Sequence, residues 1–109
     1  GINGPDLAAV VRKMGPLIAY TTVADYVIHP RARYSAQLTN YLTQDAVVRA
    51  VPFGDGFIDY KAFFEAMKAI GYKGYVAYEM CEVLDGGGSI ENLDATARTF
   101  LARFREMSR

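Results

Sequence analysis

Apolar residues recur at helical spacing in three stretches of the chain. The first helix is predicted over Asp6–Met14, with Asp6 as its N-cap. Gly15 stands where a C′ glycine ends a helix, and Pro16 prevents the helix from continuing. The apolar stripe of this helix is Leu7, Val10, Val11 and Met14.

Two further helices are expected in the second half of the chain. Asp59 is a good N-cap for a helix over Tyr60–Ile70, which Gly71 closes. Ser89 can cap a last helix over Ile90–Met107, which has the strongest helical pattern in the sequence. The apolar positions of this last helix are Leu93, Ala97, Phe100, Leu101, Phe104 and Met107.

Two short runs between these helices have the composition of strands. Leu17–Val23 is apolar, aromatic and β-branched, which predicts a buried strand. Tyr75–Glu79 is a second short strand that ends on a carboxylate. Strands that alternate with helices form a parallel sheet covered by helices, so the expected fold class is α/β.

The connection over residues 25–56 shows no clean period. It is too long to be structureless within a compact domain. It contains His-Pro-Arg at 29–31 and Pro-Phe-Gly-Asp-Gly at 52–56. We expect a short helix over Gln44–Ala50 and a functional loop in the remainder.

Two strands are too few for a complete domain of this class. A parallel pair must be buried on both faces, and each strand here keeps one open edge. Three amphipathic helices cannot cover both faces and both edges. The chain is therefore expected to be a piece of a larger α/β protein. The alternative is that other copies of the chain supply the missing surface.

The charge balance, the apolar runs and the cysteine content of the sequence limit which partners and which cellular location are expected. The 12 Lys and Arg residues balance the 12 Asp and Glu residues, so no nucleic-acid partner is expected, because that partner requires clustered positive charge. No apolar run approaches the roughly 20 residues of a membrane span, so no membrane partner is expected either. The single cysteine, Cys81, excludes an internal disulfide framework and favours a cytoplasmic location.

One part of the sequence is distinctive. It combines Pro-Phe-Gly-Asp-Gly-Phe-Ile-Asp-Tyr at 52–60 with Gly-Tyr-Lys-Gly-Tyr-Val-Ala-Tyr-Glu at 71–79, followed by Gly-Gly-Gly-Ser at 86–89. This pattern resembles the C-terminal part of sugar-phosphate isomerase/epimerase-like proteins of the xylose isomerase-like TIM-barrel superfamily. The match runs from about Val51 to Met107, and residues 6–25 fit as the preceding helix and strand.

The resemblance implies that residues 1–109 form the C-terminal part of a TIM (β/α)₈ barrel, roughly from its sixth to its eighth helix. Such barrels have about 250 residues, so most of the barrel would lie outside this sequence. Its elements would be, in order, helix six at Asp6–Met14, strand seven at Leu17–Val23, helix seven at Tyr60–Ile70, strand eight at Tyr75–Glu79 and the last helix at Ile90–Met107.

Glu79 is the strongest candidate for a catalytic residue. It ends a predicted strand, and the C-terminal ends of barrel strands carry the active site. In the families that the sequence resembles, the glutamate at the end of the eighth strand is a divalent-metal ligand and can also act in proton transfer next to a carbonyl. The alternative is a structural carboxylate, salt-bridged at the barrel rim.

The seventh strand departs from the family pattern. The family usually ends this strand with His-x-x-Asp or His-x-x-Glu, in which the histidine is a metal ligand. Here Thr22 takes the histidine position and Asp25 keeps the acid, and a hydroxyl is a poor ligand beside imidazole. Asp25 is thus a second catalytic and metal-ligand candidate, or else it caps the next turn. The resemblance implies Mn, Mg, Co or Zn as the metal, whereas Thr22 in the histidine position argues against metal binding by this chain.

The long connection also offers candidates for substrate binding. His29 is the only histidine and either folds back into the site or is simply exposed. Arg31 and Arg33 carry guanidinium groups, which suit bidentate contact with a carboxylate or phosphate.

Three glycines complete the set of substrate-binding candidates. Gly54, Gly56 and Gly87 lie in predicted strand-to-helix loops, where backbone N–H groups can approach an anion. This arrangement favours a phosphorylated sugar as substrate. The alternative is that these glycines only permit tight turns.

Two functions compete. The first is a fragment of a metal-dependent isomerase or epimerase of a sugar, sugar phosphate or inositol, acting by proton transfer next to a carbonyl. The second is a catalytically silent or self-assembling barrel fragment, motivated by Thr22 and by the short length. A third, an endonuclease IV-like DNA-repair enzyme, is disfavoured by the single histidine and zero net charge. The isolated chain is expected to be inactive, with a small sugar, the rest of the barrel or further copies of itself as partners.

Overall fold

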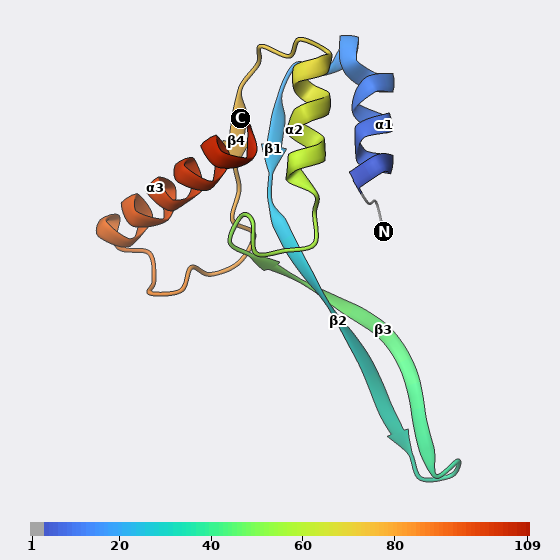
Figure 1. Ribbon diagram of the computed structural model, residues 1–109. Coiled ribbons are helices and arrows are strands. Elements are labelled where there is room, and N and C mark those ends of the chain that lie inside the picture. The colour runs from blue at the N-terminus through green and yellow to red at the C-terminus, as the bar shows by residue number, and fades with distance from the viewer. Residues whose placement is uncertain (1–3) are drawn as a thin grey trace.

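The computed structural model describes residues 4–109, which form helices beside a short parallel strand pair and a long hairpin that projects away from them (Figure 1). The strands are β1 (Thr21–Val23), β2 (Asp25–Ser35), β3 (Asn40–Val51) and β4 (Val76–Tyr78). The helices are α1 (Gly4–Met14), α2 (Tyr60–Ala69) and α3 (Ile90–Met107), and η1 (Gly15–Leu17) is a short 3₁₀ helix. None of the helices in the described part is long and apolar enough to cross a bilayer.

The pair of β1 and β4 is parallel, which confirms the predicted α/β class. Val23 lies opposite Tyr78, and the N–H of Glu79 donates to the carbonyl of Val23 at 3.0 Å. Both strands are shorter than predicted. Leu17 belongs to η1 and is 80% exposed, since the Gly-Pro pair before it forms a 3₁₀ turn rather than extended chain.

Local capping signals place the later helices correctly. The Asp59 side chain accepts a hydrogen bond from the N–H of Ala62, and α2 ends before Gly71, which has a φ of +69°. Ser89 caps α3 over the predicted range. The first helix begins at Gly4, so Asp6 lies in its first turn and is not its N-cap.

Phe53 is the centre of the main hydrophobic core. Its side chain is 1% exposed, and its ring centroid lies 4.7 to 6.4 Å from those of its aromatic neighbours. These neighbours come from α2, β4 and α3, so one residue of the loop after β3 joins all three elements. They are Tyr60, Phe64, Tyr78 and Phe100. A second cluster, of Val11, Ala66 and Met67, packs α1 against α2.

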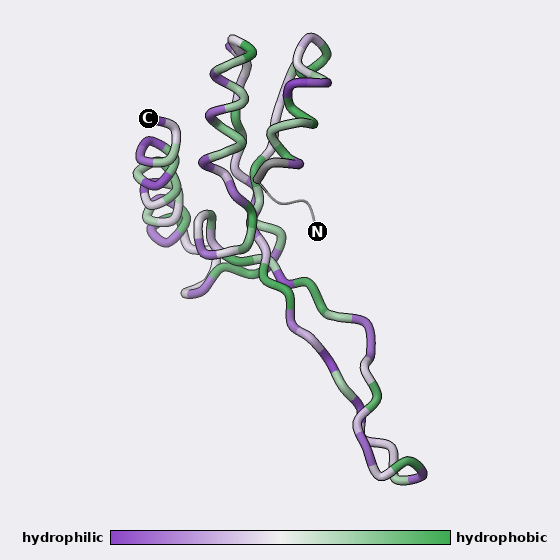
Figure 2. The backbone as a smooth tube through the Cα atoms, turned by 45° about the vertical axis from the view of Figure 1, so that its right-hand side comes forward, coloured by the Kyte–Doolittle hydropathy of each residue, from purple (hydrophilic) through white to green (hydrophobic). Residues whose placement is uncertain are grey.

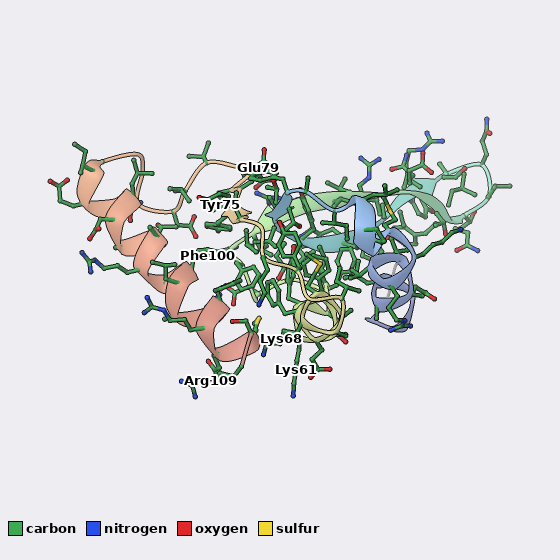
Figure 3. All side chains as sticks on the ribbon, turned by 90° about the horizontal axis from the view of Figure 1, so that it is seen from above. Lys61, Lys68, Tyr75, Glu79, Phe100 and Arg109 are labelled. Carbon is green, nitrogen blue, oxygen red and sulfur yellow. The ribbon has the colours of Figure 1, made fainter. Side chains whose placement is uncertain are left out.

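The helices cover one face of the parallel pair and leave the other open. Val23 and Tyr78 belong to the main core, so Thr22 and Ala77 lie on the opposite face by the alternation of a strand. On that face Tyr75 is 83% exposed. Figure 3 shows Tyr75 on the side of the molecule away from Lys61 of α2. The two parallel strands do not close a barrel. On the resemblance noted above, the open face would be the interior of one.

The predicted helix over Gln44–Ala50 is wrong, because this segment is part of β3. β2 and β3 form a long antiparallel hairpin with Asp25 opposite Val51 and Ser35 opposite Asn40. The ladder is interrupted at Pro30, which has no N–H to donate, and two residues of β3 oppose this one residue of β2. Cross-strand pairing therefore decides the structure of a segment whose own periodicity is ambiguous.

Phe53→Ala tests whether the core depends on this one ring. We expect the free energy of unfolding to fall by about 3–5 kcal/mol, because the change removes a fully buried aromatic side chain and leaves a cavity. Chemical denaturation followed by circular dichroism measures this loss. Phe57→Ala is the matched control, because Phe57 is 44% exposed and should lose about 1 kcal/mol or less. Equal losses for the two variants would contradict the assignment of the core.

Candidate functional site

The carboxyl ends of β1 and β4 bring two acidic residues into neighbouring positions, with very different surroundings. Asp25 follows β1 and is 1% exposed. Glu79 follows β4, and its side chain is exposed. By alternation from Ala77, Glu79 lies on the open face of the parallel pair. Figure 3 shows Glu79 at this surface, beside Tyr75.

The carboxylate of Asp25 accepts four backbone hydrogen bonds. Its Oδ2 accepts from the N–H groups of Gly54 and Gly56, both at 2.9 Å. Its Oδ1 accepts from the N–H groups of Tyr26 at 3.0 Å and Ile58 at 3.4 Å. A carboxylate offers about four acceptor positions, so the backbone uses all of them. Asp25 therefore fixes the loop between β3 and α2 against the end of β1.

Glycine at position 56 is required by this contact. A Cβ there would lie 2.0 Å from Oδ1 of Asp25 and 2.5 Å from the carbonyl oxygen of Tyr26. Gly54 is needed for a different reason, because its φ of +91° lies in a region that other residues rarely adopt. The sequence suggested an anion cradle at these glycines. The structure shows that the anion they hold is Asp25, so these two N–H groups are not available to a substrate phosphate.

A buried tyrosine holds the end of β1 in place. The Tyr60 phenol donates to the carbonyl of Ala24 and accepts from the N–H of the same residue at 3.0 Å. Burial raises the pKa of Tyr60 to about 12, and the nearby charge of Asp25 adds to that shift. Sequence reasoning missed this role, although Tyr60 directly follows the α2 cap.

Tyr26, near the start of β2, contacts the segment that follows β4, and sequence reasoning also missed it. Its hydroxyl is 3.3 Å from the sulfur of Cys81. This hydrogen bond raises the pKa of Tyr26, and partial burial and the charge of Glu79 act in the same direction. The phenol is therefore neutral at physiological pH. Alternation from Thr22 through residue 24 could have placed Tyr26 on the same face as Glu79.

The predicted substrate residues of the connection lie on the hairpin and not in a loop that folds back. The Arg31 guanidinium donates from Nε to the carbonyl of Asp45 at 2.8 Å, and Arg33 lies opposite Leu42. At about 3.3 Å per residue, Arg31 and Arg33 are roughly 20 and 26 Å along the strand from Asp25. The extended hairpin therefore holds both arginines away from Glu79.

His29 and Gly87 have separate surroundings. His29 is exposed and contributes to a cavity of about 460 Å³ whose wall includes the ion pair of Arg49 and Glu82. Gly87 has a φ of +88° and donates its N–H to the carbonyl of Leu84. Among the described residues, neither His29 nor Gly87 forms a hydrogen bond or ion pair with the Glu79 side chain, and their predicted roles in substrate binding stay predictions.

A divalent cation takes several oxygen or nitrogen ligands, and this end of the strands does not supply such a set. Asp25 does not fit as a ligand, because each of its acceptor positions already receives a backbone N–H. Thr22 offers only a hydroxyl. Within residues 4–109, no group of three or more His, Cys, Asp or Glu side chains is placed to hold a metal ion. Of the two acids at the ends of β1 and β4, Glu79 is the exposed one and can meet a ligand.

The family comparison agrees with this geometry. The model of the xylose isomerase-like TIM barrel family matches residues 2–105, nearly the whole chain. The chain therefore belongs to this family, which is of a sugar isomerase/epimerase-like kind. No curated protein and no solved structure matches the chain.

Asp25→Asn tests the role of the carboxylate in holding the loop. An amide keeps one acceptor oxygen and presents an N–H₂ group to backbone donors, so we expect a loss of about 3 kcal/mol in the free energy of unfolding. Hydrogen exchange at the Gly54 and Gly56 amides should become faster. Asp55→Asn is the control in the same loop, because its ion pair with Arg103 is partly exposed and contributes about 1 kcal/mol at most. Unchanged exchange in Asp25→Asn would contradict the role.

The pKa of Tyr60 predicts a loss of stability at high pH. Because the pKa is about 12 in the folded state and about 10 when unfolded, the unfolded state loses its proton first. The contribution of Tyr60 is complete below pH 10 and is lost as the pH rises toward 12. The comparison is between the unfolding free energies of the wild type and Tyr60→Phe across this range. The wild type should fall more steeply, and parallel curves would refute the assignment.

Proposed function

We propose that Glu79 is the catalytic carboxylate of a sugar isomerase or epimerase, in a barrel to which this chain contributes the seventh and eighth strands. The observation that carries the proposal is the position of Glu79. It follows a parallel strand on the face that the helices leave open, which corresponds to the active-site end of a barrel interior. Family membership supports the same class of reaction.

The reaction proposed is proton transfer at the carbon next to a carbonyl. A carboxylate can remove this proton and return it to a neighbouring carbon or to the other face of the same carbon. The Glu79 carboxylate is exposed, and none of the ion pairs found among the described residues involves it, so its lone pairs are available to a substrate proton. If a divalent metal is bound by the complete barrel, Glu79 is the ligand that this chain would supply.

Asp25 has a supporting role in this proposal. Its four backbone bonds hold the loop at 52–58 and the end of β1, and this is the strand end beside Glu79. Asp25 is therefore a positioning residue. A residue that acts in this way sets the geometry of the site without exchanging a proton with the substrate. The preferred substrate in this proposal is a small sugar or sugar phosphate, and the proposed location is the cytoplasm.

A catalytically silent barrel is the second candidate. Two observations favour it, namely a hydroxyl at Thr22 where the family usually has histidine, and the use of all acceptor positions of Asp25 by the backbone. Under this alternative Glu79 would be a rim carboxylate without a substrate.

Proton exchange in a protein that contains the complete barrel separates the two candidates. Ketoses, aldoses and their phosphates are incubated in D₂O, and deuterium at the carbon next to the carbonyl is followed by NMR. Glu79→Gln should lower kcat by about 10²–10⁴, because the proton acceptor is lost. Glu82→Gln is the matched control, since Glu82 lies three residues away and pairs with Arg49.

Each outcome of this measurement favours one candidate. Exchange that needs Glu79 but not Glu82 supports the enzyme. No exchange by the wild type with any sugar tested favours the silent barrel, and unchanged exchange in Glu79→Gln overturns the role of Glu79. The 109-residue chain alone should show no exchange, because strands that a complete site requires lie outside it.

A further inference from the structure

The β2–β3 hairpin, residues 25–51, is called the arm below, because it projects away from the helices (Figure 1). The chain has a radius of gyration of 17.7 Å and measures 58 Å along its longest axis. A compact chain of this length has a radius of gyration of about 13 Å. A two-stranded hairpin by itself is marginally stable in water at best. A covering surface is therefore expected for the arm.

The arm has two chemically different faces. Residues that pair across the strands share a face, and Figure 2 shows apolar and polar positions alternating along the arm. One face, called the arm face, consists of Tyr26, Ile28, Pro30, Ala32, Tyr34, Tyr41, Thr43, Val48 and Ala50. The opposite face carries the charged and polar residues His29, Arg31, Arg33, Gln44 and Arg49 together with the apolar Val27, Leu42 and Val47, so the two faces differ in charge. Asp45, at the bulge beside Pro30, is the only charged residue on the arm-face side.

The large side chains of the arm face are open to solvent. Ile28 is 48% exposed, Val48 57%, Tyr34 52% and Tyr41 68%. The rings of Tyr34 and Tyr41 meet edge to face across the strands, with centroids 5.5 Å apart. An apolar and aromatic surface with a charged reverse side is typical of a contact surface.

We propose that the arm face binds the arm face of a second copy of this chain. In a two-fold symmetric contact each patch meets a copy of itself. A patch with several charges of one sign would therefore repel its own copy. The arm face meets this condition, whereas the opposite face would bring Arg31, Arg33 and Arg49 against their own copies. Apolar contact between identical faces is therefore favoured on one side of the arm only.

The accessible surface of the chain is large enough to include an interface with a second copy. The accessible surface of the chain is 7914 Å². A compact monomer of 12.0 kDa exposes about 6,000 Å², so roughly 1,900 Å² is in excess. A standard interface uses about 800 Å² from each partner. The excess can therefore supply one such interface at the arm and leave a similar area for the open face of the parallel pair.

Two-fold symmetry permits an arrangement in which the helices of the two copies lie at opposite ends of the paired arms. In this arrangement the arms lie antiparallel and face to face, about 10 Å apart as in stacked sheets. Tyr34 and Tyr41 of one arm then pack over Ile28 and Val48 of the other. The contact does not use Glu79, so its test does not depend on the proposed function.

Two substitutions in β3, one on each face of the arm, test this contact in the 109-residue chain. Tyr41→Glu places a charge on the arm face and should weaken the dimer at least tenfold by sedimentation equilibrium. Leu42→Glu is the matched control, because Leu42 is on the opposite face beside Arg33 and its substitution should change the dissociation constant less than threefold. Asp45→Asn should tighten the dimer. Circular dichroism of each variant confirms that the fold is kept.

Crosslinking locates the contact even if the charge variants alter the fold. In a Cys81→Ser background, Thr43→Cys puts a single thiol on the arm face and Gln44→Cys puts one on the other face. A short bismaleimide reagent, which spans the gap between stacked sheets, should join two chains through position 43 at least tenfold faster than through position 44. A monomeric wild type, a dimer insensitive to Tyr41→Glu, or equal crosslinking at both positions would overturn the proposal.

Discussion

The carboxylate of Asp25 is the contact on which the rest of this structure depends. One buried side chain receives N–H groups from the loop at 52–58 and from its own neighbour, Tyr26. The same loop carries Phe53 into the aromatic core and offers its carbonyl to Arg103 of α3. The interaction therefore joins the end of β1, the start of α2 and the last helix. An isolated buried charge would be costly, and the four donors offset that cost.

The open face of the parallel pair follows from the family fold. In a barrel the helices cover the outside and the strands turn alternate side chains inward. Here Val23 and Tyr78 face the helices, whereas Thr22 and Glu79 belong to the uncovered side. Polar residues at the ends of such strands lie where chemistry takes place in this architecture. The two acids differ in their surroundings, because Asp25 is buried among backbone N–H donors whereas Glu79 is exposed.

Signals that act over a few residues predicted much of the fold. The features that depend on contacts between distant residues could not be predicted in this way. The caps at Asp59 and Ser89 act over three residues, so the bounds of α2 and α3 could be derived from sequence. The hairpin could not, because Pro30 argues against a strand and its pairing connects residues up to 26 positions apart. The position of Asp25 on a strand end was predictable from the family pattern. Its four partners were not, since three of them lie 29 to 33 residues away.

The close approach of Gly56 to Asp25 has a consequence for how related sequences can diverge. A side chain at position 56 would occupy the space of the carboxylate oxygen, and removal of the acid would leave unpaired amides behind. A substitution at either position alone would therefore lower the stability of the fold. In related chains the two sites should therefore covary, with glycine retained wherever the acid is kept and larger residues admitted only after its loss.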